Sequence, residues 1–136
     1  PDVKWIAYSS NESGRFEVYV RPFDGGPAAP AGKVQISTGG GEFPVWGPAG
    51  KELYFMSGDN TIYAVDARNL DKRDNLPSPT PLFRACPDTQ MTFRPQAETP
   101  YNYEFDTLDG QRFLAACRVE KPGKFTVLTN WTSAPR

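Results

Sequence analysis

Short runs of aliphatic and aromatic residues alternate with polar, Gly- and Pro-rich turns along the whole chain. Segment 42–55, EFPVWGPAGKELYF, contains two such runs joined by a tight turn. Pro48 fixes φ where this turn begins, and Gly50 can adopt the left-handed conformation where it ends. Because large apolar side chains on both sides of a turn are typical of buried strands, we predict a β-hairpin here.

Similar runs on both sides of the hairpin predict further strands. They lie at 4–8, 15–20, 33–37, 61–65, 82–85, 103–105, 111–115 and 125–131. The run 15–20 alternates, so Phe16, Val18 and Val20 are predicted to share one face. The charged segment 66–75 has few apolar residues and is predicted to be a solvated loop.

Three of the runs occupy the same place in successive units of a repeat. KWIAY begins at residue 4, KELYF at residue 51 and QRFLA at residue 111. A repeat of about 40 to 50 residues with four short strands is typical of a β-propeller blade, whose sheet packs face to face on its neighbours. We therefore predict one all-β domain over 1–136, with about three four-stranded antiparallel blades of a partial propeller. The expected blades are 1–38, 39–86 and 101–132, with a linking loop at 87–100, and the first and last blades are incomplete.

The turn sequence 44–51, PVWGPAGK, carries a family resemblance, together with IY at 62–63 and DGG at 24–26. It resembles the WD40-like or TolB-type (PD40) bacterial propeller repeats, whose blades have a pattern close to P-x-W-S-P-D-G-K. Gly47 and Ala49 depart from that pattern. Repeats of this kind are specific for fold and unspecific for activity.

The end of the chain, 125–131, looks like the final strand of propellers appended to bacterial Ser/Thr kinases and related sensor proteins. This resemblance implies the C-terminal blades of a larger sensor or scaffold protein. It also suggests a bacterial protein of the periplasm or another extracytoplasmic compartment, whereas the residues themselves leave the localisation open.

Composition and charge exclude several classes of function. Fifteen Lys and Arg against sixteen Asp and Glu give a net charge of -1, so there is no basic field to attract nucleic acid or anionic lipid. No apolar run approaches the roughly 20 residues that cross a bilayer. The chain has no His, which removes Ser-His-Asp and Cys-His catalysis and the usual nitrogen ligand of transition metals. We expect no nucleic-acid partner, no membrane insertion, no cofactor and no enzymatic activity.

The two cysteines, Cys86 and Cys117, are too few for a disulfide scaffold and lack the paired spacing of a zinc site. We predict two structural thiols, with a single disulfide as the alternative.

Two loops have sequences that could suggest ligand chemistry. Segment 106–110, DTLDG, is superficially similar to a calcium loop, but Asp109 and Gly110 fill the turn position of the repeat. Segment 38–41, TGGG, lacks the Lys and Ser/Thr of a phosphate-binding loop and is predicted to link two blades. The tryptophans are predicted to be core residues: Trp5, Trp46 and Trp131.

Binding residues are expected at one end of the molecule, where the links between blades and the loops between second and third strands project together. The candidates in these loops are Asn11, Glu12, Arg15, Glu42, Asp59 and Asn60. Phe93 and Arg94 are added because they lie in the long link 87–100, and insertions in a regular repeat often carry binding function.

These observations predict a non-catalytic propeller module that binds a protein or peptide. The alternative is the propeller portion of a larger enzyme, either gating a peptidase or attached to a kinase. Propellers close with about 4 to 8 blades, so the free blade faces need cover. We expect either further blades of a parent chain or, for the isolated chain, a homo-oligomer.

Overall fold

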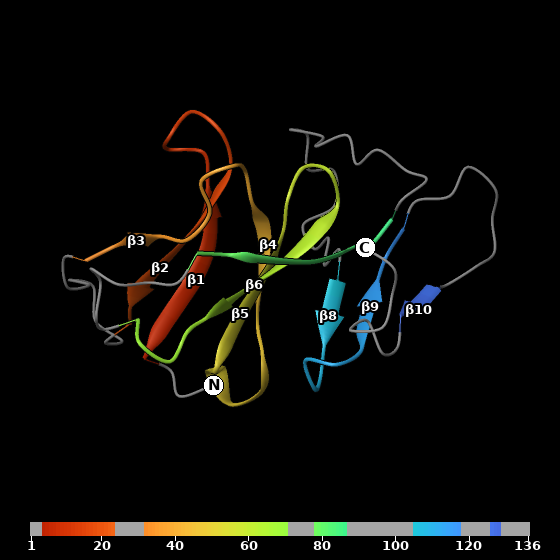
Figure 1. Ribbon diagram of the computed structural model, residues 1–136. Coiled ribbons are helices and arrows are strands. Elements are labelled where there is room, and N and C mark those ends of the chain that lie inside the picture. Colours follow the sequence, from red (N-terminus) through yellow and green to blue (C-terminus); the bar gives the residue numbers. More distant parts are fainter. Residues whose placement is uncertain (1–3, 24–31, 71–77, 87–104, 118–125, 129–136) are drawn as a thin grey trace.

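The computed structural model describes residues 4–23, 32–70, 78–86, 105–117 and 126–128, whose strands form three antiparallel sheets (Figure 1). The first sheet has the order β1-β2-β3, with β1 (Trp5–Ser10), β2 (Glu17–Pro22) and β3 (Val34–Gln35). The second has the order β4-β5-β6-β7, with β4 (Glu42–Trp46), β5 (Glu52–Met56), β6 (Thr61–Asp66) and β7 (Thr80–Arg84). The third has the order β10-β9-β8, with β8 (Phe105–Thr107), β9 (Phe113–Ala115) and β10 (Thr126–Leu128).

The predicted all-β class with antiparallel sheets is confirmed. Each strand of a sheet pairs with the next strand along the chain, so every sheet is a simple meander. The three repeated runs lie in β1, β5 and β9, and in the second and third sheets these are the second strands. In the described residues the sheets have three, four and three strands.

The turn between β4 and β5 has the predicted chemistry. Pro48 begins the short 3₁₀ turn η1 (Pro48–Gly50), and Gly50 has a φ of 65°. The Gly47 N–H donates to the Glu52 carbonyl over 2.9 Å and closes the hairpin. Ala49 also has a positive φ, 55°, a conformation in which its Cβ is strained.

Strand β5 is covered on both faces, as its unbroken apolar run predicts. Leu53 and Phe55 belong to a hydrophobic cluster shared with the first sheet. Tyr54 and Met56 belong to a second cluster, shared with the third sheet. Because side chains of a strand alternate between faces, the second sheet is sandwiched between its two neighbours.

In the first sheet, the structure corrects the prediction that Phe16 shares a face with Val18 and Val20. Val18 and Val20 are fully buried in the first cluster, as expected. Phe16 precedes β2 and is 40 % exposed, because the pleat that aligns alternate side chains begins only at Glu17. The predicted core tryptophans Trp5 and Trp46 are half-buried against the first cluster. The third, Trp131, lies outside the described residues.

The second and third sheets meet around aromatic rings. Tyr54 contacts Phe113 edge to face, with ring centroids 5.1 Å apart. A Cβ placed on Gly47 would lie 2.8 Å from the Tyr54 ring, and one on Gly110 would lie 2.6 Å from its hydroxyl oxygen. The Tyr54 hydroxyl donates to the Glu52 carboxylate, and burial is the main cause that raises its pKa. The two glycines therefore make room for this ring, which explains why Gly47 departs from the repeat pattern.

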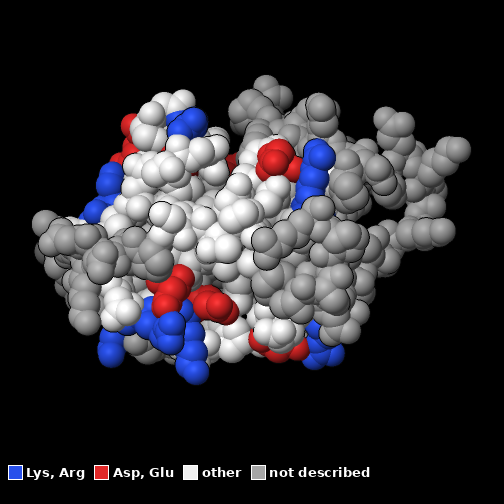
Figure 2. Space-filling view, viewed as in Figure 1, with Lys and Arg blue, Asp and Glu red and all other residues white. Residues whose placement is uncertain are grey.

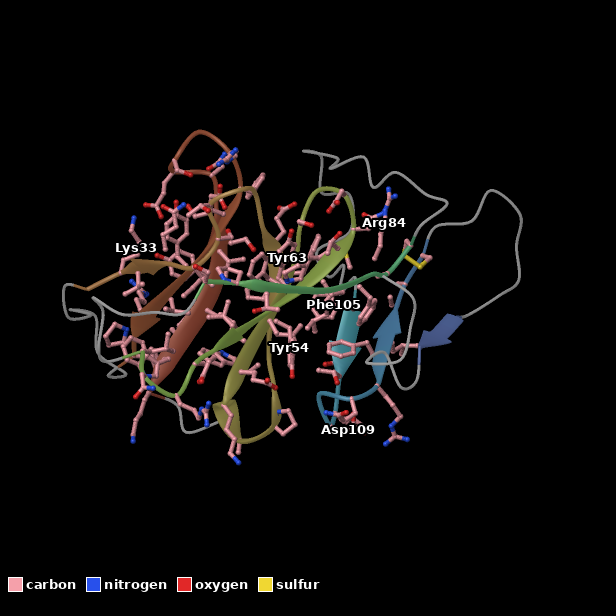
Figure 3. All side chains as sticks on the ribbon, in the orientation of Figure 1. Lys33, Tyr54, Tyr63, Arg84, Phe105 and Asp109 are labelled. Atoms are coloured by element: carbon pink, nitrogen blue, oxygen red, sulfur yellow. A yellow bond between two sulfur atoms is a disulfide. The ribbon has the colours of Figure 1, made fainter. Side chains whose placement is uncertain are left out.

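A disulfide joins Cys86, just after β7, to Cys117, just after β9, with an S–S distance of 2.05 Å (Figure 3). The prediction of two structural thiols is wrong, and the alternative of a single disulfide is correct. Packing of the second cluster brings the two Cα atoms to 5.5 Å, which only the tertiary structure can decide.

Candidate binding surface

Three connections lie together at the upper end of the molecule in Figure 1: the β1–β2 loop, the β3–β4 link and the β5–β6 turn. The β4–β5 and β8–β9 turns lie at the opposite end. Figure 3 accordingly shows Arg84 at the upper end and Asp109 at the lower end. The described loops with the predicted residues Asn11, Glu12, Arg15, Asp59 and Asn60 thus share one end, while the role of those residues stays a prediction.

The β1–β2 loop presents three of the candidates. Asn11 is exposed, and its carbonyl accepts the Gly14 N–H over 2.9 Å. Glu12 is exposed and forms an ion pair of 2.6 Å with Lys33. The Arg15 guanidinium is held by the Glu17 carboxylate and by the Thr38 carbonyl, although 61 % of the side chain is exposed.

The β5–β6 turn places its two candidates differently. Asp59 is exposed, and its carboxylate accepts the Ser57 hydroxyl over 2.5 Å, which is the main cause that lowers its pKa. Asn60 is completely buried, has a φ of 67°, and its side-chain N–H donates to the Cys86 carbonyl over 3.2 Å. Asn60 is therefore a correction to the candidate residues, because it holds the turn from inside the molecule and does not face solvent.

The remaining candidates lie elsewhere. Glu42 is half-buried at the first position of β4, opposite Met56 of β5. Phe93 and Arg94 lie outside the described residues. The structure thus brings together the exposed side chains of the β1–β2 loop and of Asp59 at one end, and it separates Asn60 from them.

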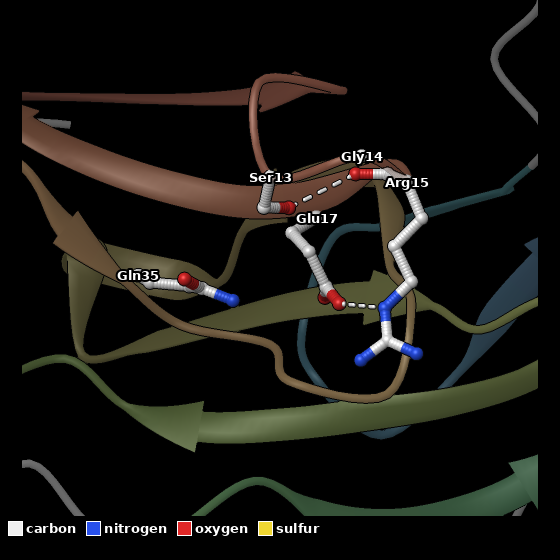
Figure 4. A pocket seen from close by; sticks show the side chains of 5 residues that line it. All are labelled: Ser13, Gly14, Arg15, Glu17 and Gln35. Atoms are coloured by element: carbon white, nitrogen blue, oxygen red, sulfur yellow. Dashed lines mark hydrogen bonds and ion pairs between the residues drawn. The ribbon is translucent and has the colours of Figure 1, made fainter.

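A hollow of about 370 Å³ beside the β1–β2 loop was not predicted from the sequence (Figure 4). It is lined by Ser13, Gly14, Arg15, Glu17 and Gln35. Glu17 is only 1 % exposed. The sequence offered no strand signal for this hollow, because Arg15 precedes β2, which begins at Glu17.

Glu17 can stay buried because both of its carboxylate oxygens accept hydrogen bonds. It accepts the Arg15 Nε–H over 2.6 Å and the Ser37 hydroxyl over 2.5 Å. The Gly40 N–H lies 3.0 Å from Oε1 and 3.1 Å from Oε2. Ser37 also accepts the Val18 N–H over 2.8 Å. Such bonding offsets the desolvation of a buried carboxylate, and it fastens the link 38–41 to β2.

This network explains the glycines of the β3–β4 link. A Cβ on Gly41 would lie 2.7 Å from the Ser37 hydroxyl oxygen, so a larger residue would displace it. The Gly40 N–H, which could otherwise bind an anion, already donates to Glu17. Segment 38–41 connects β3 to β4 and therefore links two sheets, while its role as a link between blades stays a prediction.

The calcium-like segment at the lower end is a bonded turn. Asp109 Oδ1 accepts the backbone N–H groups of Gln111 and Arg112, each over 2.8 Å, and Oδ2 accepts the Arg112 Nε–H over 2.8 Å. These bonds lower the pKa of Asp109 to about 2, and the two backbone N–H groups make the largest contributions. In the part of the chain that the structure describes, no cluster of three or more metal-ligating side chains occurs.

The hydrogen bonds of Asp109 predict that the stability of the fold depends on pH. An unfolded Asp titrates near about 3.9, so the contribution of Asp109 is complete above that pH and is lost as pH falls through about 2. We expect the melting temperature to fall between about pH 4 and pH 2, and to fall less in Asp109→Asn, which has no charge to lose. Thermal melts of both proteins from pH 6 to pH 2 measure this. Identical pH profiles for the two proteins would contradict it.

The surface in view carries charges of both signs. Figure 2 shows basic and acidic side chains next to one another among uncharged residues on this face. None of the helices among these residues has the length and apolar character to cross a membrane.

Comparisons with protein-family models, with curated proteins and with solved structures found no match to this chain.

Proposed function

We propose that the chain is a non-catalytic β-propeller module that binds a protein or peptide partner with the loops at its upper end. The observation that carries the proposal is the sandwiched second sheet, whose strand β5 buries Leu53 and Phe55 on one side and Tyr54 and Met56 on the other. Successive meander sheets packed face to face are what blades of a propeller require.

The inner strands support the same interpretation. Strand β4, the first strand of the second sheet, contacts β8, the first strand of the third sheet, and also contacts β1, which the repeat aligns with the second strands β5 and β9. Contacts between the first strands of neighbouring sheets are expected where blades surround a common axis. The resemblance of 44–51 to WD40-like and TolB-type repeats adds to this, and the proposed blades 1–38, 39–86 and 101–132 each contain one sheet.

A binding role follows from how the polar groups are used. The buried carboxylate of Glu17 is occupied by hydrogen bonds from Arg15, Ser37 and Gly40, so it is poorly suited to accept a proton from a substrate. Asn11, Glu12 and Asp59 are instead exposed on loops held by rigid sheets. Loops positioned by such a scaffold are where recognition is commonly located.

A selection of displayed random peptides on the purified chain tests this function. We expect enriched peptides to bind the wild-type protein and to lose at least fivefold in affinity on Asn11→Ala and Glu12→Ala. The control is Gln111→Ala, an exposed residue at the opposite end, which should leave affinity unchanged. Loss of binding only in the Gln111 variant would overturn the proposed surface. Substrate turnover abolished by a single point substitution would overturn the non-catalytic role.

The outward side of the third sheet favours a larger assembly. Leu114 of β9 is 54 % exposed, although it lies in the middle of a three-stranded sheet. We propose that this face is covered, either by further blades of a parent chain, which includes the alternative of a larger enzyme, or by a second copy. Light scattering on the isolated chain should then show a dimer or larger species, and a stable monomer would contradict the second copy.

A further inference from the structure

We propose that the hollow lined by Ser13, Arg15, Glu17 and Gln35 is a recognition site for the carboxamide of an Asn or Gln side chain in a peptide ligand. This inference rests on the proposed function, because it names the ligand chemistry of one part of the binding surface. The hollow, about 370 Å³, is at the small end of ligand sites and suits one side chain.

The polar groups around the hollow are held in place by hydrogen bonds. Arg15 uses its Nε–H for Glu17 and one terminal N–H for the Thr38 carbonyl. Gln35 donates its side-chain N–H to the Ser37 carbonyl over 2.7 Å. The Ser13 hydroxyl donates to the Arg15 carbonyl over 3.2 Å. Each side chain is therefore oriented before a ligand arrives, which lowers the entropy cost of binding.

The unused groups form a mixed set of donors and acceptors. A guanidinium has five N–H donors, so Arg15 keeps terminal N–H groups after its two bonds. The side-chain oxygen of Gln35 and the lone pairs of the Ser13 hydroxyl remain as acceptors. Figure 4 shows the Gln35 amide and the Arg15 guanidinium on either side of Glu17. A ligand that accepts a hydrogen bond from Arg15 and donates one to the Gln35 oxygen would contact both side chains.

Charge selects among the ligands that fit. Glu17 lies 2.6 Å from Arg15, so the pair is close to neutral as a whole. An ionised carboxylate has no donor for the Gln35 oxygen and would approach the Glu17 charge. An ammonium group would have to face the Arg15 guanidinium. A carboxamide is uncharged and carries one acceptor and two donors, which is the complementary set.

The neighbouring surface can support the ligand backbone. Gln35 is paired with Tyr19 in the sheet, and Tyr19 stacks on Tyr8 at 5.8 Å between ring centroids. Lys33 lies over the Tyr19 ring at 4.8 Å and also pairs with Glu12. Tyr19 is only 2 % exposed, so the side chains that a ligand backbone could contact here are the exposed Lys33 and the partly exposed Tyr8.

The test is a titration of the ¹⁵N-labelled chain followed by NMR. The probe is N-acetylglutamine methylamide, and the matched control is N-acetylglutamate methylamide at neutral pH, which has the same shape with a carboxylate. We expect the glutamine probe to shift the backbone resonances of Ser13, Gly14, Arg15 and Gln35, and to bind at least fivefold more tightly than the glutamate probe.

Matched variants separate this site from the rest of the surface. Gln35→Leu removes the proposed acceptor and should weaken the glutamine probe at least fivefold, whereas Gln111→Leu at the opposite end should not. Ser13→Ala provides a second variant if the spectrum of Gln35→Leu shows a misfolded chain. Equal binding of the two probes, no shifts at the hollow, or full binding by Gln35→Leu would overturn the proposal. Selected peptides that still bind in that case would show that the proposed function survives without this site.

Discussion

Replacing Phe113 by alanine is expected to lower the free energy of unfolding by on the order of 3 to 5 kcal/mol, the usual cost of removing a buried aromatic ring. Phe113 is 1 % exposed. Its ring lies 5.1 Å from that of Tyr54, 5.3 Å from that of Phe83 and 6.4 Å from that of Phe105. The substitution leaves a cavity between the second and third sheets, where rigid strands can close it only in part.

Urea denaturation measures the effect of this substitution. The control is Leu108→Ala, because Leu108 is 91 % exposed in the same sheet region and should change stability by no more than about 0.5 kcal/mol. If Phe113→Ala does not fold, Phe113→Leu should still show a smaller, measurable loss. A loss below about 1 kcal/mol for Phe113→Ala would mean that the third sheet is not packed on the second as described.

Removing the disulfide is expected to cost about 3 to 4 kcal/mol in the chain-entropy account, because Cys86 and Cys117 are separated by 31 residues in sequence. The bond ties the end of β7 to the end of β9, so its loss also frees one edge of the second core cluster. The double variant Cys86→Ala/Cys117→Ala, compared with wild type by urea denaturation, measures this cost.

A reducing agent provides the internal control for this prediction. It should lower the stability of the wild-type chain to that of the double variant and leave the double variant unchanged. Two free thiols in the native, unreduced protein would contradict the disulfide. Since disulfides persist in oxidising compartments, we expect the full stability of this fold only outside a reducing cytosol.

Features that depend on neighbours in the sequence could be predicted. Alternating and continuous apolar runs indicated nearly every described strand, because the side-chain period of a strand is a local property. Pro48 and Gly50 indicated the β4–β5 turn for the same reason, since each restricts or frees its own backbone. The unbroken run Leu53 to Met56 even predicted that the second sheet would be covered on both faces, as the two clusters confirm.

Features that depend on which segments meet in space could not be predicted. The pairing of Cys86 with Cys117 depends on the packing of β7 against β9. The buried position of Asn60 depends on the hydrogen bond from its side chain to the Cys86 carbonyl. The hollow is lined by residues from separate segments, the β1–β2 loop, β2 and β3, which meet only in the folded chain. The sequence by itself therefore determined the strands, their turns and the all-β class, because these follow from local backbone preferences. Only the tertiary structure decided the disulfide and the candidate site, because each requires residues from separate segments to lie within bonding distance.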